Sequence, residues 1–99
     1  MIQAQFFIDK DELFHDELLS DFVLRFLLDH NIDGATVFIG RNGFGKHQKV
    51  NRPNDLFSFD ETPLLITFVD EAEKMEHTIK ALRQVITSGF LFTHPVTIW

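Results

Sequence analysis

Cysteine and tyrosine are both absent from this sequence of 99 residues, which also contains only one tryptophan and three prolines. The lack of cysteine excludes a disulfide framework, thiol catalysis and cysteine-ligated metal, and it is compatible with a reducing compartment. No apolar run reaches the ~18 residues that a membrane-spanning helix needs. The first residues also lack the basic start of a secretion signal. We therefore expect a cytoplasmic protein without a transmembrane segment.

Positive charge is scarce as well. The chain has 9 Lys and Arg against 15 Asp and Glu, which gives a formal net charge of −6 and disfavours nucleic acid as a partner. The hydrophobic fraction of 44%, with 12 Phe, is well above that of a disordered chain. A chain of this length has room for one modest core, so residues 1–99 are expected to form a single domain.

Alternating apolar side chains predict a first strand at residues 2–8. A first helix should follow, capped by Asp9 or Asp11. It should end near His30-Asn31, because a cation suits a helix C-terminus and Asn tolerates the left-handed conformation that stops helices. Its inward stripe recurs every four residues, with Phe14, Leu18, Phe22 and Phe26 widened by Leu19, Val23 and Leu27.

The middle of the chain predicts two strands separated by a long connection. Residues 35–39 alternate and run into the glycine-rich stretch 40–45, where regular pairing should end. Residues 46–62 are mostly polar and look like a long connection rather than a tight turn. Residues 64–69 are apolar enough for a strand buried on both faces, and therefore central in a sheet.

The last third of the sequence predicts a helix and a strand. Asp70 and Glu73 resemble a capping box, and Ser88-Gly89 should end the helix. Residues 90–98 should form an edge strand, because Pro95 cannot donate a ladder hydrogen bond. The inward face of the helix carries Met75, Ile79, Leu82 and Ile86 at helical spacing.

The order strand, helix, strand, strand, helix, strand predicts an α+β, ferredoxin-like βαββαβ fold. This fold has a four-stranded antiparallel sheet with two helices on one face. Apolar side chains then remain for the other face of the sheet, namely Phe7, Phe38, Leu65 and Val69. Such a patch typically marks an association surface, so we expect the chain to oligomerise through its sheet.

Signatures of catalysis and metal binding are missing. The five histidines fall on different elements without metal-ligand spacing, so no metal site is expected. Paired carboxylates lie in caps and loops rather than in an apolar cleft that would separate their pKa values. The serines lie in no nucleophile-elbow pattern. The residues therefore predict a protein that is not an enzyme.

Four segments together carry a family resemblance. They are Gly34-Ala35-Thr36-Val37, Gly43-Phe44-Gly45-Lys46, Pro63 leading into Val69-Asp70, and Glu73-Lys74-Met75-Glu76. At this spacing the chain resembles an uncharacterised PII-like "domain of unknown function" family, similar in layout to the PII nitrogen-signalling proteins. The resemblance implies a ferredoxin-like trimer that binds nucleotides in clefts between subunits. A long loop that starts just after Gly-Phe-Gly reports the ligand state to partners.

The resemblance also implies a set of ligand-binding residues. Glycines let phosphate oxygens approach backbone N–H groups, and lysines would supply positive charge. From the residues alone, the glycines favour a bulge or turn at a strand end over a ligand site, and the lysines favour a solvated loop. The expected ligand-binding residues are Gly43, Phe44, Gly45, Lys46 and His47 at the loop base, Lys49, and Gly89 near the short loop of the neighbouring subunit.

Departures from the PII pattern narrow the expected ligand. His47 stands where PII proteins place a Gln used for metal and 2-oxoglutarate, which disfavours 2-oxoglutarate sensing. Residues 87–90 lack the longer Gly- and Lys-containing loop that PII proteins use on triphosphates, and the chain ends at Trp99 without their basic C-terminal segment. A mono- or diphosphate is therefore expected.

The leading expectation is a trimeric sensor without a cofactor, which binds an adenine nucleotide and signals through residues 46–62. Family members encoded near or fused to fluoride exporters imply a membrane transporter as the protein partner. One alternative is a ligand-independent interaction module. The other is a metal-binding trimer similar to the copper-tolerance relatives of this fold, with His47 or His94 as ligands. The identity of the ligand, the partner and the pathway stays open.

Overall fold

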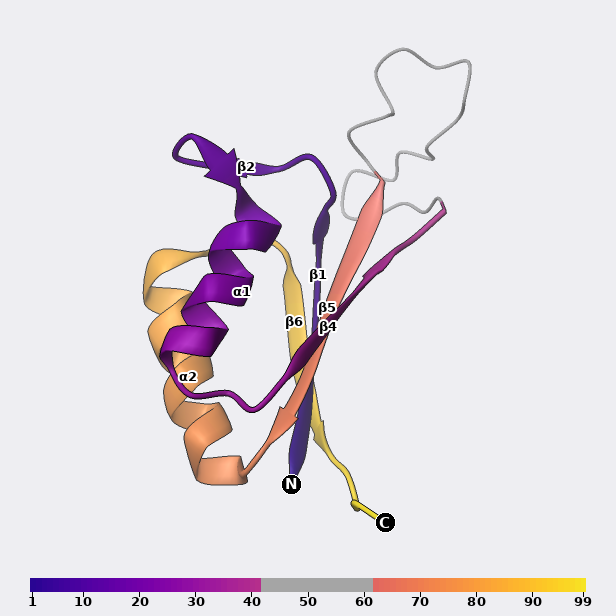
Figure 1. The fold of residues 1–99 in the computed structure, drawn as a ribbon, viewed down its shortest axis with the longest axis vertical. Coiled ribbons are helices and arrows are strands. Elements are labelled where there is room, and N and C mark those ends of the chain that lie inside the picture. The colour runs from indigo at the N-terminus through magenta and orange to yellow at the C-terminus, as the bar shows by residue number, and fades with distance from the viewer. Residues whose placement is uncertain (42–61) are drawn as a thin grey trace.

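The computed structural model describes residues 1–41 and 62–99, which form two helices on one face of a four-stranded antiparallel sheet (Figure 1). Its elements are β1 (Ile2–Asp9), β2 (Leu13–Phe14), β3 (Glu17–Leu18), α1 (Leu19–Asp29), β4 (Ala35–Ile39), β5 (Pro63–Asp70), α2 (Ala72–Val85) and β6 (Phe90–Pro95). The sheet order is β4-β5-β1-β6, and β2 pairs with β3 in a small hairpin. The expected ferredoxin-like arrangement is thus confirmed, while most of the expected 46–62 connection lies outside the described residues.

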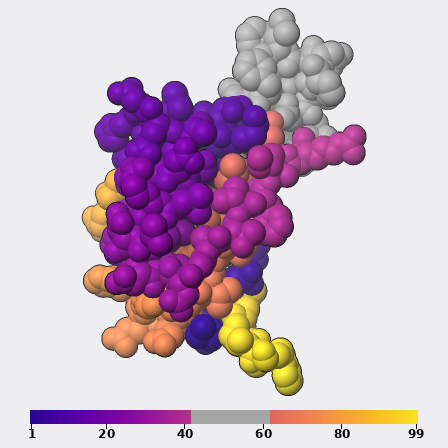
Figure 2. Space-filling view, viewed as in Figure 1, coloured from indigo at the N-terminus to yellow at the C-terminus, as the bar shows by residue number. Residues whose placement is uncertain are grey.

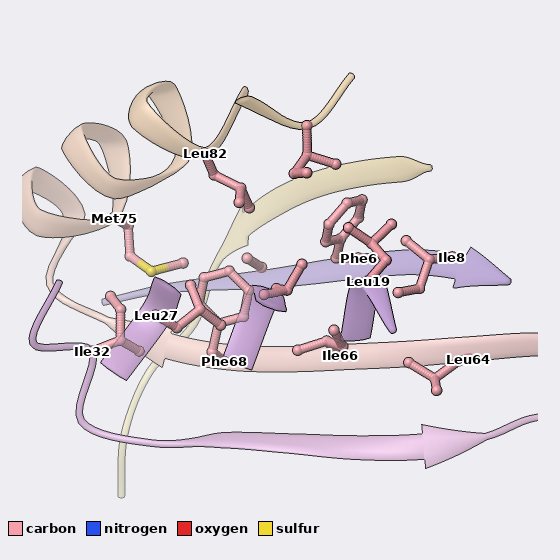
Figure 3. Packing of buried hydrophobic residues seen from close by; sticks show 13 residues of the cluster. Phe6, Ile8, Leu19, Leu27, Ile32, Leu64, Ile66, Phe68, Met75 and Leu82 are labelled. Atoms are coloured by element: carbon pink, nitrogen blue, oxygen red, sulfur yellow. The ribbon is translucent and has the colours of Figure 1, made fainter. Parts of the chain in front are cut away.

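The core lies between the helices and the two central strands, β1 and β5 (Figure 3). In the register of these strands Ala4 opposes Phe68, and Phe6 opposes Ile66. The predicted central place of β5 is confirmed, but β5 is fully buried only on the side of the helices. The buried core consists of Ala4, Phe6, Ile8, Leu19, Val23, Leu27, Ile32, Leu64, Ile66, Phe68, Met75, Leu82 and Ile86.

The first helix begins at Leu19, so the predicted start near Asp9 or Asp11 is wrong. The chain first turns through His15, whose positive φ of 49° interrupts a right-handed helix. Phe14 lies in the hairpin before the helix, where its ring packs 4.5 Å from that of Phe22. Phe14 therefore reaches the predicted stripe from a different element. Leu18, the second predicted member, lies in β3 and is 39% exposed, so its predicted inward position is wrong.

Inside α1 the fully buried positions are not the predicted phenylalanines. Val23 and Leu27 are fully buried, whereas Phe22 and Phe26 are only partly buried at the margin of the core. The predicted end of the helix is confirmed, because His30 is its C-cap and Asn31 has a left-handed φ of 63°. The two large aromatic side chains therefore cover the core rather than fill it.

The second helix begins without the predicted capping box. Its N-cap is Glu71, which makes no side-chain capping bond. The buried Asp70 carboxylate instead accepts hydrogen bonds from the backbone N–H groups of Glu71 at 2.8 Å and Asp33 at 3.0 Å, and lies 3.2 Å from Lys74 Nζ. The carboxylate thereby ties the segment before β4 to the start of α2. The helix ends at Val85, earlier than the predicted Ser88-Gly89.

Asp70→Asn should destabilise the fold by about 1–3 kcal/mol at neutral pH. Burial, the largest influence, raises the pKa of Asp70, but the N–H groups of Glu71 and Asp33 together with Lys74 hold the pKa below its ordinary 3.8. A carboxylate with a lowered pKa stabilises the fold above its ordinary pKa, and this contribution is lost as pH falls through the folded-state pKa. Urea unfolding of both proteins at pH 7 and below pH 3.8 measures the difference, which should shrink in acid.

Glu76→Gln is the matched control for this prediction. Glu76 also pairs with a lysine four residues later, at 3.0 Å from Lys80 Nζ, but both side chains are largely exposed. An exposed pair of this kind contributes less than about 1 kcal/mol. An equal loss in Asp70→Asn and Glu76→Gln would contradict the role assigned to the buried carboxylate.

The sheet face opposite the helices carries apolar side chains, as predicted. The strand register places Phe7, Leu65, Phe90 and Phe92 on this face together with Phe38. The Phe7 and Phe92 rings stack with centroids 6.2 Å apart, and Phe90 lies 5.5 Å from Phe92. Phe38 is 56% and Phe90 66% exposed in the single chain. We refer to this surface as the open sheet face.

The last strand ends at Pro95, three residues before the predicted 98. The N–H of Val96 still donates to the carbonyl of Met1 at 3.0 Å, and the chain then leaves the sheet. Ile98 is 62% exposed and Trp99 is fully exposed. Figure 2 shows these C-terminal residues, in yellow, projecting from the rest of the chain.

Candidate functional site

One end of the sheet carries the described residues that flank the predicted site. Here β1 and β4 finish while β5 and β6 begin (Figure 1). The N–H of Gly40 donates to the carbonyl of Pro63 at 2.7 Å, and that of Lys10 donates to the carbonyl of Thr62 at 2.8 Å. Arg41 and Thr62, which flank positions 42–61, therefore leave the sheet from paired neighbouring strands. We refer to the end of β4 and the start of β5, from which residues 41 and 62 leave the sheet, as the loop base.

The predicted ligand-binding residues divide into two groups. Gly89 is described, at the start of β6. The other residues stay a prediction, since they lie outside the described residues: Gly43, Phe44, Gly45, Lys46, His47 and Lys49. The structure therefore describes only the segments next to the predicted site, namely the loop base and the turn before Gly89.

Gly89 occupies a place that tolerates no other residue without strain. Its φ of +80° lies in the left-handed region, and a Cβ there would lie 2.5 Å from Phe6 Cε1 and 2.9 Å from the carbonyl oxygen of Phe7. The backbone at Gly89 therefore packs directly on β1. A glycine is needed here both for its conformation and for its lack of a side chain.

Arg83, which the sequence did not single out, binds the turn that leads to Gly89. Its Nη1 donates to the carbonyls of Ile86 at 3.1 Å and Ser88 at 2.6 Å, and its Nη2 donates to that of Gly89 at 3.3 Å. The guanidinium also lies 5.2 Å from the centre of the Phe6 ring. A cation in the last turn of a helix was the available signal, since such side chains often bind terminal carbonyls.

The turn is also tied to the segment that precedes the β2–β3 hairpin. Ser88 Oγ donates to Glu12 Oε2 at 2.6 Å. Close by in sequence, Asp9 Oδ1 accepts from the N–H of Asp11 at 2.9 Å, and Lys10 Nζ lies 3.3 Å from Asp11 Oδ1. Acidic groups thus outnumber the single Lys10 cation in residues 9–12. This balance is unfavourable for a highly charged polyphosphate.

Within one chain the loop base and the Gly89 turn lie far apart. Arg41 follows β4, Gly89 precedes β6, and these strands are the two edges of the sheet. Three steps between neighbouring strands separate them, which is about 14 Å. The backbones at the end of β4 and at the Gly89 turn are therefore too far apart within one chain to contact the same phosphate group.

Other candidate sites in the described residues are weaker. No three His, Asp or Glu side chains gather as a metal site among them, and His94 Nε2 instead lies 3.4 Å from Gln5 Nε2. A groove of about 400 Å³ lies between α2 and the Ile2 end of β1, at the other end of the sheet from the loop base. Met75 and Ile79 give it an apolar wall.

None of the helices in residues 1–41 and 62–99 combines the length and apolar character needed to cross a bilayer.

Comparisons with known proteins agree with this geometry. Residues 1–98 match the family DUF190, described as "Uncharacterized ACR, COG1993". A "UPF0166 protein" of Aquifex aeolicus (strain VF5) is 27% identical over 78 residues, which are 78% of this chain and 73% of that protein. Two structures of CPII, a nitrogen regulatory PII-like protein from Thiomonas intermedia K12, are similar in fold.

The first CPII structure, bound to ADP, AMP and bicarbonate, has a TM-score of 0.65 and 17% identity, and the match covers 94% of this chain and 82% of CPII. The second, bound to ADP and bicarbonate, has a TM-score of 0.64 and 17% identity with the same coverage of 94% and 82%. At this identity the likeness establishes the fold, which is that of a PII-like protein.

Proposed function

Because the chain belongs to the DUF190 family and shares the fold of PII-like CPII, we propose that it is a PII-like regulator that binds an adenine nucleotide between subunits. The observation that carries the proposal is the position of the loop base and the Gly89 turn at opposite edges of one sheet. Two copies placed side by side bring these elements to a common cleft. The ADP and AMP bound to CPII support the choice of ligand.

The proposed assembly is a homotrimer formed through the open sheet face. Its exposed phenylalanines form an apolar patch that is costly to leave in water. In a closed ring each copy offers one edge of its sheet to the next copy, so every subunit contributes to two clefts. This arrangement gives one nucleotide site per subunit.

The proposed signal is a change in residues 46–62, which follow the loop base. A nucleotide controls such a segment only if it binds more tightly to one arrangement than to another. In this proposal the protein acts in the cytoplasm as a regulator and not as an enzyme. The segment docks on a protein partner, for which a membrane transporter is the class that the family resemblance suggests.

The ligand is proposed to be a mono- or diphosphate. The described side of the cleft has little spare positive charge. Lys10 pairs with Asp11 and Arg83 binds three carbonyls, which leaves the exposed Arg41 as the remaining cation among the described residues of the loop base and the turn. Each added phosphate charge needs its own compensating donor or cation. AMP and ADP therefore suit this side of the cleft better than ATP does.

A thermal-shift panel confirmed by calorimetry tests the proposal. Purified protein is measured with AMP, ADP, ATP, cyclic AMP, 2-oxoglutarate, bicarbonate and fluoride. AMP or ADP at 100 times its Kd should stabilise the fold by about 2.7 kcal/mol. Gly45→Val should abolish this shift, because a side chain there blocks the approach of phosphate to the backbone.

Gly34→Val is the control variant, since a Cβ at Gly34 meets no other atom within 4 Å. It should bind nucleotide like the wild type. If no compound raises the melting temperature of the wild type, the ligand-independent interaction module becomes the better hypothesis. Stoichiometric metal in the purified protein would instead favour the metal-binding trimer with His47 or His94 as ligands.

A further inference from the structure

The guanidinium of Arg83 fixes the direction of two peptide groups in the turn before β6. Its Nη1 binds the carbonyls of Ile86 and Ser88, which belong to the same peptide groups as the N–H groups of Thr87 and Gly89. In a trans peptide the C=O and the N–H point in opposite directions. The N–H groups of Thr87 and Gly89 therefore point away from Arg83.

These two N–H groups are available for a ligand. Neither donates a backbone hydrogen bond within the described residues, and Thr87, Ser88 and Gly89 are all exposed. Two backbone N–H groups that point out of one turn, both away from Arg83, can donate together to an anion. Because the carbonyls point toward the Arg83 guanidinium, the turn offers backbone N–H donors on its other side without a charged side chain of its own.

We propose that Arg83 is a positioning residue that holds the 86–89 turn ready to bind the nucleotide phosphate. The inference rests on the proposed function and adds to it a residue that controls the affinity of the protein for the nucleotide. Without Arg83 the turn would populate several conformations, and the apparent affinity would fall by the fraction that remains competent. The Ser88–Glu12 hydrogen bond alone holds one side chain and no peptide group.

Arg83→Lys is the informative substitution. Lysine keeps the charge and most of the aliphatic stem beside Phe6, but its single ammonium lacks the planar fork that binds several carbonyls at once. Arg25→Lys is the matched control, because Arg25 also uses its fork, on Glu17 at 2.9 and 2.7 Å, on an exposed surface. Both variants should keep the fold.

The test combines ADP calorimetry with backbone NMR relaxation of the ligand-free protein. Arg83→Lys should bind ADP about tenfold more weakly and show lower backbone order parameters at Thr87 and Gly89, with those of β1 unchanged. Arg25→Lys should match the wild type in both measurements. Unchanged ADP affinity in Arg83→Lys overturns the inference, and so does weaker binding with unchanged order parameters, which would indicate a direct contact.

The failure of the proposed function gives a different result. If the wild type itself binds neither ADP nor AMP, the proposed function fails and the positioning role falls with it. If the wild type binds and Arg83→Lys binds equally well, only the positioning role fails. The two failures are therefore distinguishable from one set of titrations.

Discussion

Replacing Gly89 by alanine should lower the free energy of unfolding by about 2–5 kcal/mol, from a left-handed backbone and an overpacked contact. The new Cβ would lie 2.5 Å from Phe6 Cε1, 2.8 Å from Ile8 Cγ2 and 2.9 Å from the carbonyl oxygen of Phe7. The side-chain atoms belong to the packed core, and the oxygen belongs to a central strand. Relief would therefore require the start of β6 to move away from β1.

Urea unfolding of Gly89→Ala and Gly34→Ala, followed by circular dichroism, measures this effect. A Cβ at Gly34 meets no atom within 4 Å, so Gly34→Ala should be neutral or slightly stabilising. Equal stabilities of the two variants would mean that the turn before β6 is looser than described. For a protein of ordinary stability the expected loss at Gly89 is a large fraction of the total.

Phe92→Asp should convert the proposed trimer into monomers. Phe92 packs against both Phe7 and Phe90 in the aromatic cluster of the open sheet face. Burial of an unpaired carboxylate in an association surface is strongly unfavourable, whereas the same carboxylate remains hydrated in a monomer. Light scattering should therefore report about three times 11.5 kDa for the wild type and 11.5 kDa for the variant.

Leu28→Asp is the control for this experiment. Leu28 is 71% exposed and lies on α1, on the other side of the sheet from the open face. It should leave the mass unchanged. A monomeric wild type would refute association through the sheet, and a trimeric Phe92→Asp would place the interface elsewhere.

The sheet was predictable from the sequence because its signals are local. In β1 the alternation of Ala4, Phe6 and Ile8 with partly exposed neighbours marks the face toward the helices. Pro95 correctly indicated an edge strand. The family resemblance, which depended on short motifs spread over the chain, is confirmed by the DUF190 match over residues 1–98.

The errors came from contacts that the spacing of residues along the chain does not determine. Phe14 fits the helical stripe by spacing, yet it reaches Phe22 from the β2–β3 hairpin. Asp70 has the composition of a helix cap, but one of its partners is the N–H of Asp33, 37 residues away. A one-dimensional pattern cannot distinguish a side chain that caps its own helix from one that binds a remote segment.

The candidate site was predictable only in part. Gly89 was identified through the resemblance, and its backbone conformation gives a physical reason for the glycine. Arg83 was missed because its one signal, a cation in the last turn of a helix, suits a solvated side chain as well as one that binds three carbonyls. Gly43 to Lys49 stay a prediction, because they lie outside the described residues.

The projecting C-terminal segment has a spectroscopic consequence. Trp99 is the only tryptophan, the chain has no tyrosine, and the indole is fully exposed in the single chain. Intrinsic tryptophan fluorescence therefore comes from this one indole ring, which makes no contact with the core in the single chain. Its emission should change little when the core unfolds. Any surface that covers the ring should shift the emission to shorter wavelength. The unmodified protein can therefore report an assembly that covers its C-terminal segment without an added label.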